Sequence, residues 1–165
     1  MAETVPHPNR IAAISLDEST VLARGPQVEQ ERGAALRDLV VDSHFRPIRA
    51  IELGHSGPWS LDLAVVDGRL AIGLRDHHGR DAGGIGLGLA RFRRTVREYF
   101  AICDSYFKAV RKASAQELET LDMARRGIHD RGARHLLEAL DGKVELDHDT
   151  ARRLFTLVCV LHIRA

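Results

Sequence analysis

The chain has 165 residues, of which 44% are hydrophobic and 28% charged, and its formal net charge is +1. This composition is that of an ordinary globular domain and excludes a disordered or fibrous protein. A chain of this length can bury roughly 70% of its unfolded surface in one core. We therefore expect one α+β domain over residues 9–165, preceded by a mobile tail at residues 1–8.

No membrane or secretory segment is expected. The N-terminus lacks the basic and apolar regions of a signal peptide, and the longest nearly apolar run, Leu154–Ile163, is about half the length of a membrane span. The two cysteines, Cys103 and Cys159, lie in apolar stretches without metal-ligand spacing. The sequence therefore predicts a cytoplasmic protein with buried thiols, no metal, no cofactor and no membrane partner.

The two parts of the chain differ in charge. Residues 1–90 contain 9 Lys and Arg against 12 Asp and Glu, whereas residues 91–165 contain 15 against 11. This polarity favours an anionic partner on the C-terminal part. A competing explanation is codon preference, because 21 of the 24 basic residues are Arg.

Up to residue 90 the pattern is mainly extended. Arg10–Leu16 suggests a strand, and Pro26 begins a helix expected to reach about Asp42, with Val28 and Ala35 inside and Glu31 outside. Further strands are expected at Ile48–Leu53, Trp59–Val66, Leu70–Leu74 and Ile85–Leu89. Asp67 and Gly68 form a hairpin motif, because both positions require positive φ. The sequence predicts an antiparallel meander of four strands, to which Arg10–Leu16 adds a fifth.

From Arg91 onward the pattern is helical. One helix carries an apolar arc from Phe92 to Val110, and the capping box Ser114–Glu117 begins the next, which we expect to be broken or kinked near Gly127 and Gly132. The last helix begins near Asp147 or Asp149 and is apolar on every side. It is therefore either the central core helix or partly buried in a subunit interface. We expect three to four helices against the sheet, with the C-terminal helix central.

Several segments resemble a known family. They are Leu16–Glu18, Val28–Arg32, Phe92–Arg94, Tyr99–Tyr106, Asp122–His129, Gly142–Glu145 and Asp149–Leu157. Together they resemble uncharacterised protein family 0262 of the UPF series, found in alphaproteobacteria. The resemblance spans nearly the whole chain and departs from the family at Gly83–Gly88, which is richer in glycine. It implies no activity, cofactor or catalytic residue.

Three motifs that contain glycine or histidine are typical of ligand sites but are incomplete. Gly83–Gly88 has the spacing G-G-x-G-x-G rather than G-x-G-x-x-G, so a glycine-rich strand packed closely against a helix is favoured over a nucleotide loop. His77-His78 and the Asp147–Asp149 segment complete no zinc or calcium motif.

Three arginine doublets are the anion-binding candidates: Arg93-Arg94, Arg125-Arg126 and Arg152-Arg153. Consecutive helical residues diverge by about 100°, so at most one of each pair points easily toward a shared centre. A guanidinium group binds an oxyanion through two parallel hydrogen bonds. Two interpretations stay open: structural ion pairs with Asp122, Asp147 or Asp149, or a site for a phosphate or carboxylate.

Three hypotheses of function follow. The first is a non-catalytic binding or regulatory module that recognises an anionic group or a protein partner through these arginines and dimerises through the apolar C-terminal helix. The alternative is a small enzyme for a phosphorylated or carboxylated metabolite, with His129 as acid or base and Asp122 orienting it. The third is RNA or DNA binding along the flank Arg93, Arg97, Lys108 and Arg111, which no known motif supports. The absence of a complete catalytic motif favours the first.

Overall fold

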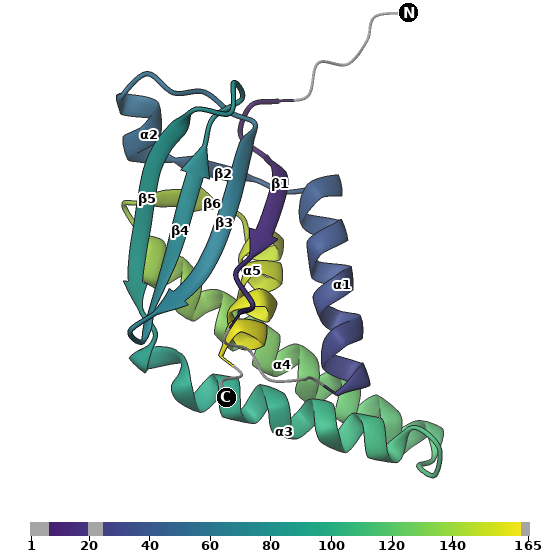
Figure 1. Ribbon diagram of the computed structural model, residues 1–165. Coiled ribbons are helices and arrows are strands. Elements are labelled where there is room, and N and C mark those ends of the chain that lie inside the picture. Colours follow the sequence, from purple (N-terminus) through teal and green to yellow (C-terminus); the bar gives the residue numbers. More distant parts are fainter. Residues whose placement is uncertain (1–6, 20–24, 163–165) are drawn as a thin grey trace, which may run out of the picture.

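The computed structural model describes residues 7–19 and 25–162 and has the expected α+β class. Its main sheet has the order β1-β3-β4-β5 (Figure 1), with the bounds β1 (Ile11–Leu16), β3 (Trp59–Val66), β4 (Arg69–Arg75) and β5 (Asp81–Gly88). The last three strands form the expected antiparallel meander. Strand β1, however, pairs parallel to β3, so the sheet is mixed and the expectation of a purely antiparallel sheet is wrong in this one pairing.

The parallel pairing of β1 follows from what separates it from β3. The chain passes through helix α1 (Pro26–Val41), strand β2 (Phe45–Pro47) and helix α2 (Ile48–Glu52) before β3 begins. A tight turn allows only antiparallel pairing, whereas a connection of a dozen or more residues, most often helical, brings the next strand back in parallel. Helix α1 supplies that crossover and packs against β1.

The hairpin between β3 and β4 is confirmed, because Asp67 and Gly68 have φ values of 52° and 74°. The strand expected at Ile48–Leu53 is wrong: this segment is α2, and the short strand β2 before it pairs antiparallel with β6 (Val144–Leu146). A short apolar run fits a strand or a helix equally well. The extended Pro47 precedes α2, and Ala50 inside it is buried.

Three helices form the C-terminal part: α3 (Arg93–Ala109), which follows the 3₁₀ turn η1 (Ala90–Phe92), α4 (Ala115–Leu140) and α5 (His148–Leu161). Both expected caps are present. Ser114 Oγ accepts a hydrogen bond from the Glu117 amide at 3.2 Å, and Asp147 Oδ1 accepts one from the Thr150 amide at 2.9 Å.

The break expected near Gly127 and Gly132 is absent, because α4 is helical throughout. Gly132 has a packing role instead. A Cβ atom at this position would overlap the ring of Phe155 on α5. The glycine therefore lets α4 and α5 approach closely, and this closeness outweighs the roughly 1 kcal/mol that glycine costs inside a helix.

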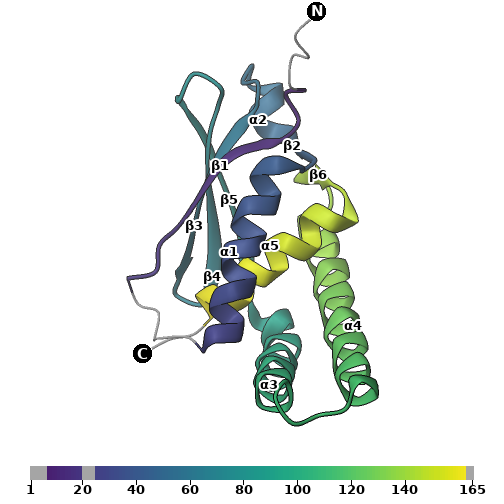
Figure 2. The ribbon, with the colours of Figure 1, turned by 90° about the vertical axis from the view of Figure 1, so that its right-hand side faces the viewer.

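Helices α1 and α5 lie next to one face of the sheet, and α5 crosses the interior between the sheet and α4 (Figure 2). All side chains from Leu154 to Leu161 are buried, together with Thr150 and Ala151. Of the two interpretations of the apolar helix, the central core helix is the one observed. The described part of α5 leaves no exposed apolar face for a second subunit, so dimerisation through this helix is not supported.

Two expectations concern the ends of the chain. Residues 1–6 of the expected tail lie outside the described residues, and so does Ile163 at the end of the apolar run. His7 and Pro8 are described and exposed. Within the described residues, no helix combines the length and the apolar character that crossing a bilayer requires.

Candidate anion-binding site

Helices α1, α4 and α5 enclose a pocket of about 190 Å³. We call it the arginine pocket, and its lining is Glu31, Ala34, Ala35, Asp38, Arg125, Arg126, His129, Arg152, Arg153 and Thr156. Both members of two sequence doublets line it, one doublet from α4 and one from α5. Both arginines of a doublet can contribute to the lining because the pocket lies where α4 and α5 pack against each other, although their guanidinium groups have different partners.

The floor of the arginine pocket is built around the carboxylate of Glu31, whose side chain is only 9% exposed. Its Oε1 lies 2.6 Å from Arg125 Nη1 and 3.4 Å from His129 Nε2. Its Oε2 accepts hydrogen bonds from the Tyr99 hydroxyl and, at 3.3 Å, from the Cys103 thiol. Burial by itself would raise the pKa of Glu31, but hydrogen bonds from His129, Tyr99 and Arg125 and the charge of His129 outweigh it and hold that pKa at about 2.

Asp122 belongs to this network in a role that differs from the expected one. Its Oδ1 lies 2.5 Å from Arg125 Nη2, and its Oδ2 lies 2.7 Å from Arg126 Nη2. Asp122 therefore holds the two arginines of α4 and does not orient His129. The structure therefore contains ion pairs of the expected kind for both Arg125 and Arg126, and Arg125 bridges Glu31 and Asp122.

His129 is oriented by groups on α1 and α5. Its Nδ1 lies 3.2 Å from Thr156 Oγ1, and the Thr156 hydroxyl donates to the carbonyl oxygen of Arg152 at 3.3 Å. Because Thr156 uses its only proton on that carbonyl, it accepts the hydrogen bond from His129 Nδ1. The other ring nitrogen faces Glu31, so both nitrogens of His129 point at acceptors.

The rim of the arginine pocket is less compensated than its floor. Arg126 shares Asp122 with Arg125, and its side chain is 68% exposed. Arg152 Nη2 lies 4.0 Å from Asp149, which is the limit of an ion pair, and Arg153 Nη1 donates to the neutral carbonyl of Asp42 at 2.9 Å. These three guanidinium groups lie at the mouth of the pocket, whose lining also contains the acidic residues Glu31 and Asp38. Arg152 is also within electrostatic reach of Asp130, and Arg153 of Asp147.

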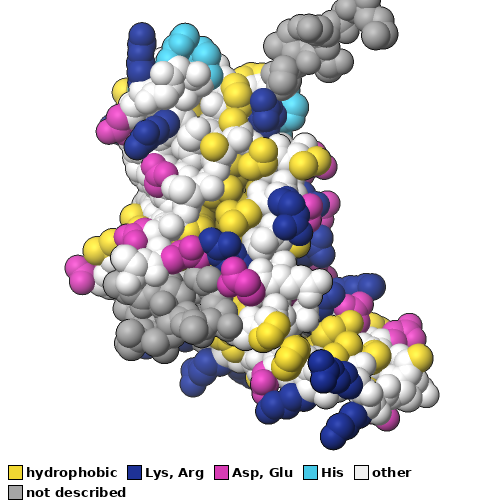
Figure 3. Space-filling view, turned by 45° about the vertical axis from the view of Figure 1, so that its right-hand side comes forward, with side chains coloured by type: hydrophobic (Ala, Val, Ile, Leu, Met, Phe, Trp, Pro, Cys, Tyr) yellow, Lys and Arg dark blue, Asp and Glu magenta, His cyan; other side chains and the backbone are white. Residues whose placement is uncertain are grey.

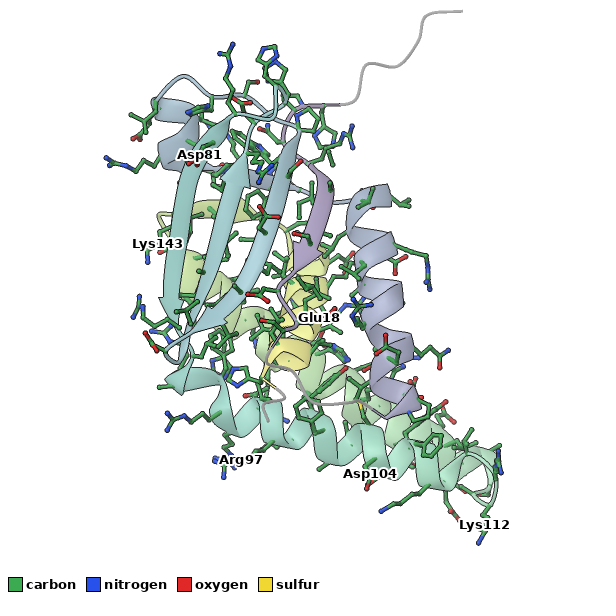
Figure 4. The ribbon with its side chains drawn as sticks, in the orientation of Figure 1. Glu18, Asp81, Arg97, Asp104, Lys112 and Lys143 are labelled. Carbon is green, nitrogen blue, oxygen red and sulfur yellow. The ribbon has the colours of Figure 1, made fainter. Side chains whose placement is uncertain are left out.

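The third doublet does not join the site. Arg93 and Arg94 are exposed on α3 and do not line the pocket, and Arg94 Nε lies 3.2 Å from Glu98 of its own helix. On the same helix Lys108 pairs with Asp104 at 2.9 Å, and Arg97 points away from the body of the protein (Figure 4). Figure 3 shows acidic and basic side chains interspersed over the visible helical surface rather than a continuous basic stripe.

Sequence analysis missed Glu31, which it placed on the outer face of α1. The helical spacing could have found it. Glu31 follows the buried Val28 by three residues and precedes the buried Ala35 by four, so it lies on the apolar stripe. A carboxylate on such a stripe requires a buried partner, and Arg125 supplies it.

The prediction of buried thiols is confirmed for both cysteines. Burial and the neighbouring Glu31 carboxylate raise the pKa of the Cys103 thiol to about 12, and burial also raises that of Cys159. Both shifts disfavour the thiolate, which is the reactive form of cysteine.

The fold and the pocket define a small α+β protein whose helical layer holds a buried Glu–Arg–Tyr–His network beneath a rim of arginines. The chain belongs to the Uncharacterised protein family (UPF0262), whose sequence model matches residues 8–164. A relative from Erythrobacter litoralis is 56% identical over 156 residues, covering 94% of this chain and 98% of the relative. One from Sphingopyxis alaskensis is 48% identical over 164 residues, covering 99% of both. Both are named only as UPF0262 proteins, and no solved structure matches the chain.

Proposed function

We propose that this protein is a non-catalytic binding module that holds a small anion, a phosphate or carboxylate group, in the arginine pocket. The observation that carries the proposal is the convergence of Arg125, Arg126, Arg152 and Arg153 on one pocket. Such groups repel one another, and an oxyanion that bridges them would relieve that repulsion through charge-assisted hydrogen bonds.

The division between floor and rim supports this proposal. Arg125 is held between two carboxylates, so its charge is already compensated. Among the rim arginines, Arg126 shares its carboxylate with Arg125, Arg152 lies 4.0 Å from its carboxylate, and Arg153 bonds a neutral carbonyl. These three are therefore the groups that an incoming anion would contact. The volume of about 190 Å³ suits one anionic group rather than a nucleotide-sized molecule, because pockets for larger ligands occupy about 300–1,000 Å³.

The enzymatic alternative has less support. A general acid or base needs a nitrogen within hydrogen-bond reach of the proton that it transfers. One ring nitrogen of His129 faces Thr156 and the other faces Glu31, and Asp122 is occupied by the arginines. We therefore propose binding without chemistry. We place it in the cytoplasm, where unpaired buried thiols such as Cys103 and Cys159 remain reduced.

The test uses inorganic phosphate and succinate as probes, with thermal unfolding as the measurement. A ligand that binds only the folded state raises the unfolding temperature in a concentration-dependent manner. We expect at least one probe to do so in the wild type and to lose this effect in the R126A/R152A variant.

The matched control is R93A/R94A, which removes two exposed arginines outside the pocket and should respond like the wild type. If neither probe raises the unfolding temperature at concentrations up to about 10 mM, which is about 100-fold above a dissociation constant of 0.1 mM, the arginine pocket does not bind these anions. An equal response of the two double variants would lead to the same conclusion.

A further inference from the structure

Strand β5 is a sheet edge that nothing in the described part of the chain covers with another strand. It pairs with β4 on one side only, at the end of the order β1-β3-β4-β5 (Figure 1). Natural edges are often blunted by charged side chains, proline or a covering element. Here the exposed positions Gly83, Gly84, Gly86 and Gly88 carry no side chain of their own. Lys143 Nζ donates to the Gly86 carbonyl at 3.4 Å, so this lysine must move aside for a second backbone to pair with the edge.

A groove follows this edge. One cavity of about 470 Å³ lies between β5 and α2, and a second of about 380 Å³ lies between β5 and η1. The two share Gly86 and Lys143, so they adjoin and together accompany the strand from Ala82 to Gly88. We call them the β5 groove. A groove between a sheet edge and a neighbouring helix is the setting in which extended peptides add as a strand.

The lining of the β5 groove carries a net positive charge. Its lining contains Arg49, Arg69, Arg91 and Lys143, against a single acidic residue, Glu52. Among the ion pairs of the described residues, none involves these four cations. Lys143 Nζ contacts only the carbonyl of Gly86, at 3.4 Å, and it projects beside β5 in Figure 4.

The groove also offers an apolar contact. Leu53 at the end of α2 is 65% exposed, and Ile85 on β5 is half-buried. Both line the wider cavity, on the side of the groove away from Arg91. An occupant that alternates acidic and apolar side chains would satisfy the cations and cover Leu53 at once, because successive side chains of a strand point to opposite faces.

We propose that the β5 groove binds an acidic, extended segment of a partner protein, which adds to β5 as a fifth strand of the main sheet. The backbone of the segment pairs with the free edge, its carboxylates face Arg49, Arg91 and Lys143, and an apolar side chain contacts Leu53. This interaction is independent of the arginine pocket, which lies among α1, α4 and α5.

The test uses a fluorescein-labelled octapeptide of alternating Glu and Val, with binding followed by fluorescence polarisation. We expect saturable binding that weakens about tenfold or more in the R91E/K143E variant and for the peptide with Lys in place of Glu. The matched control is R111E/K112E, which reverses the same residue types at the far end of α3 (Figure 4) and should keep wild-type affinity. Equal binding of the Lys peptide, unchanged affinity in R91E/K143E, or no binding would each overturn the proposal.

A second measurement tests strand addition itself. Methylating alternate backbone nitrogens of the Glu-Val peptide removes the donors on one edge, so binding should be lost, and the bound parent peptide should slow hydrogen exchange at β5 amides. Equal binding of the methylated peptide would show that no strand pairing occurs. Sedimentation of the free protein completes the test, because a dimer that R91E/K143E dissociates would mean that the groove holds a second copy instead. Tighter binding of a single-stranded oligonucleotide than of the peptide, lost in the same variant, would equally overturn the proposal.

Discussion

The two basic regions of this protein differ in what lies beside their cations. In the arginine pocket, Arg125 is clamped between Glu31 and Asp122, and acidic side chains remain within reach of the rim. In the β5 groove, four cations share a lining with one acidic residue. A partly buried guanidinium such as that of Arg125 is compensated by the fold itself, whereas an exposed one remains available to a partner.

The two regions should therefore respond differently to substitution. Changes in the floor of the arginine pocket should alter the stability of the fold, whereas changes in the β5 groove should alter only binding.

Removing the central cation of the pocket floor should have the largest effect. In R125M the buried Glu31 carboxylate loses its arginine partner and keeps its contacts with Tyr99, Cys103 and His129, and breaking a buried ion pair in this way costs about 3 kcal/mol. Urea unfolding should show this loss, and R126A, which removes an exposed partner of Asp122, should cost less than about 1 kcal/mol. Equal losses in the two variants would contradict the division between floor and rim.

The same network should make stability depend on pH in acid. The pKa of Glu31 is about 2 in the folded protein against an ordinary value of 4.5, so the unfolded chain takes up the proton first as pH falls. The stabilisation is fully present above pH 4.5 and is lost toward pH 2. Between pH 5 and pH 3 the loss from Glu31 should be about 2 kcal/mol.

Urea unfolding at several pH values measures this loss, and the E31Q variant isolates it. Other carboxylates contribute slopes of their own, among them Asp76, whose pKa a hydrogen bond from His55 lowers. The difference in slope between wild type and E31Q removes those contributions. Parallel curves for the two proteins would mean that Glu31 is not the group that titrates.

A change in the distance between α4 and α5 should affect both the stability of the fold and binding in the arginine pocket, but not binding in the β5 groove. In G132A the added methyl group meets the Phe155 ring, and overpacking of this kind costs about 1–3 kcal/mol, part of which the better helix propensity of alanine offsets. The helices that carry the two arginine doublets must then shift. We expect weaker phosphate or succinate binding with unchanged affinity for the Glu-Val peptide.

Substitutions in the β5 groove should have the smallest effect on stability. Because Arg91 and Lys143 make no ion pair with the described residues, R91E/K143E should change the free energy of unfolding by less than about 0.5 kcal/mol. Urea unfolding measures this difference. A larger loss would show that these cations support the fold, and the contrast between the two regions would fail.

Local chemistry made much of the fold predictable from the sequence. Pro26 marked the start of α1, Asp67-Gly68 the hairpin, Ser114 the cap of α4 and Asp147 that of α5. Each motif acts through neighbours within a few residues, so no knowledge of the tertiary structure was needed.

What could not be predicted depends on contacts between distant segments. The parallel pairing of β1 requires the path of α1, and the helical state of Ile48–Glu52 depends on packing that a five-residue pattern cannot specify. The doublets suggested an anion site, but which two of them converge is decided by the crossing of α4 and α5 at Gly132. Glu31 was detectable in principle from its helical spacing, whereas its partner Arg125, 94 residues away, was not.

The position of α5 in the chain also has a consequence for biosynthesis. The helix around which the other elements pack follows all of them in the chain, so the meander and the earlier helices lack their common apolar partner until residues 148–161 have been translated. Premature termination before residue 148 should thus yield a product with an exposed interior, prone to aggregation or proteolysis. Translation of α5 is therefore a condition for folding of the elements that precede it.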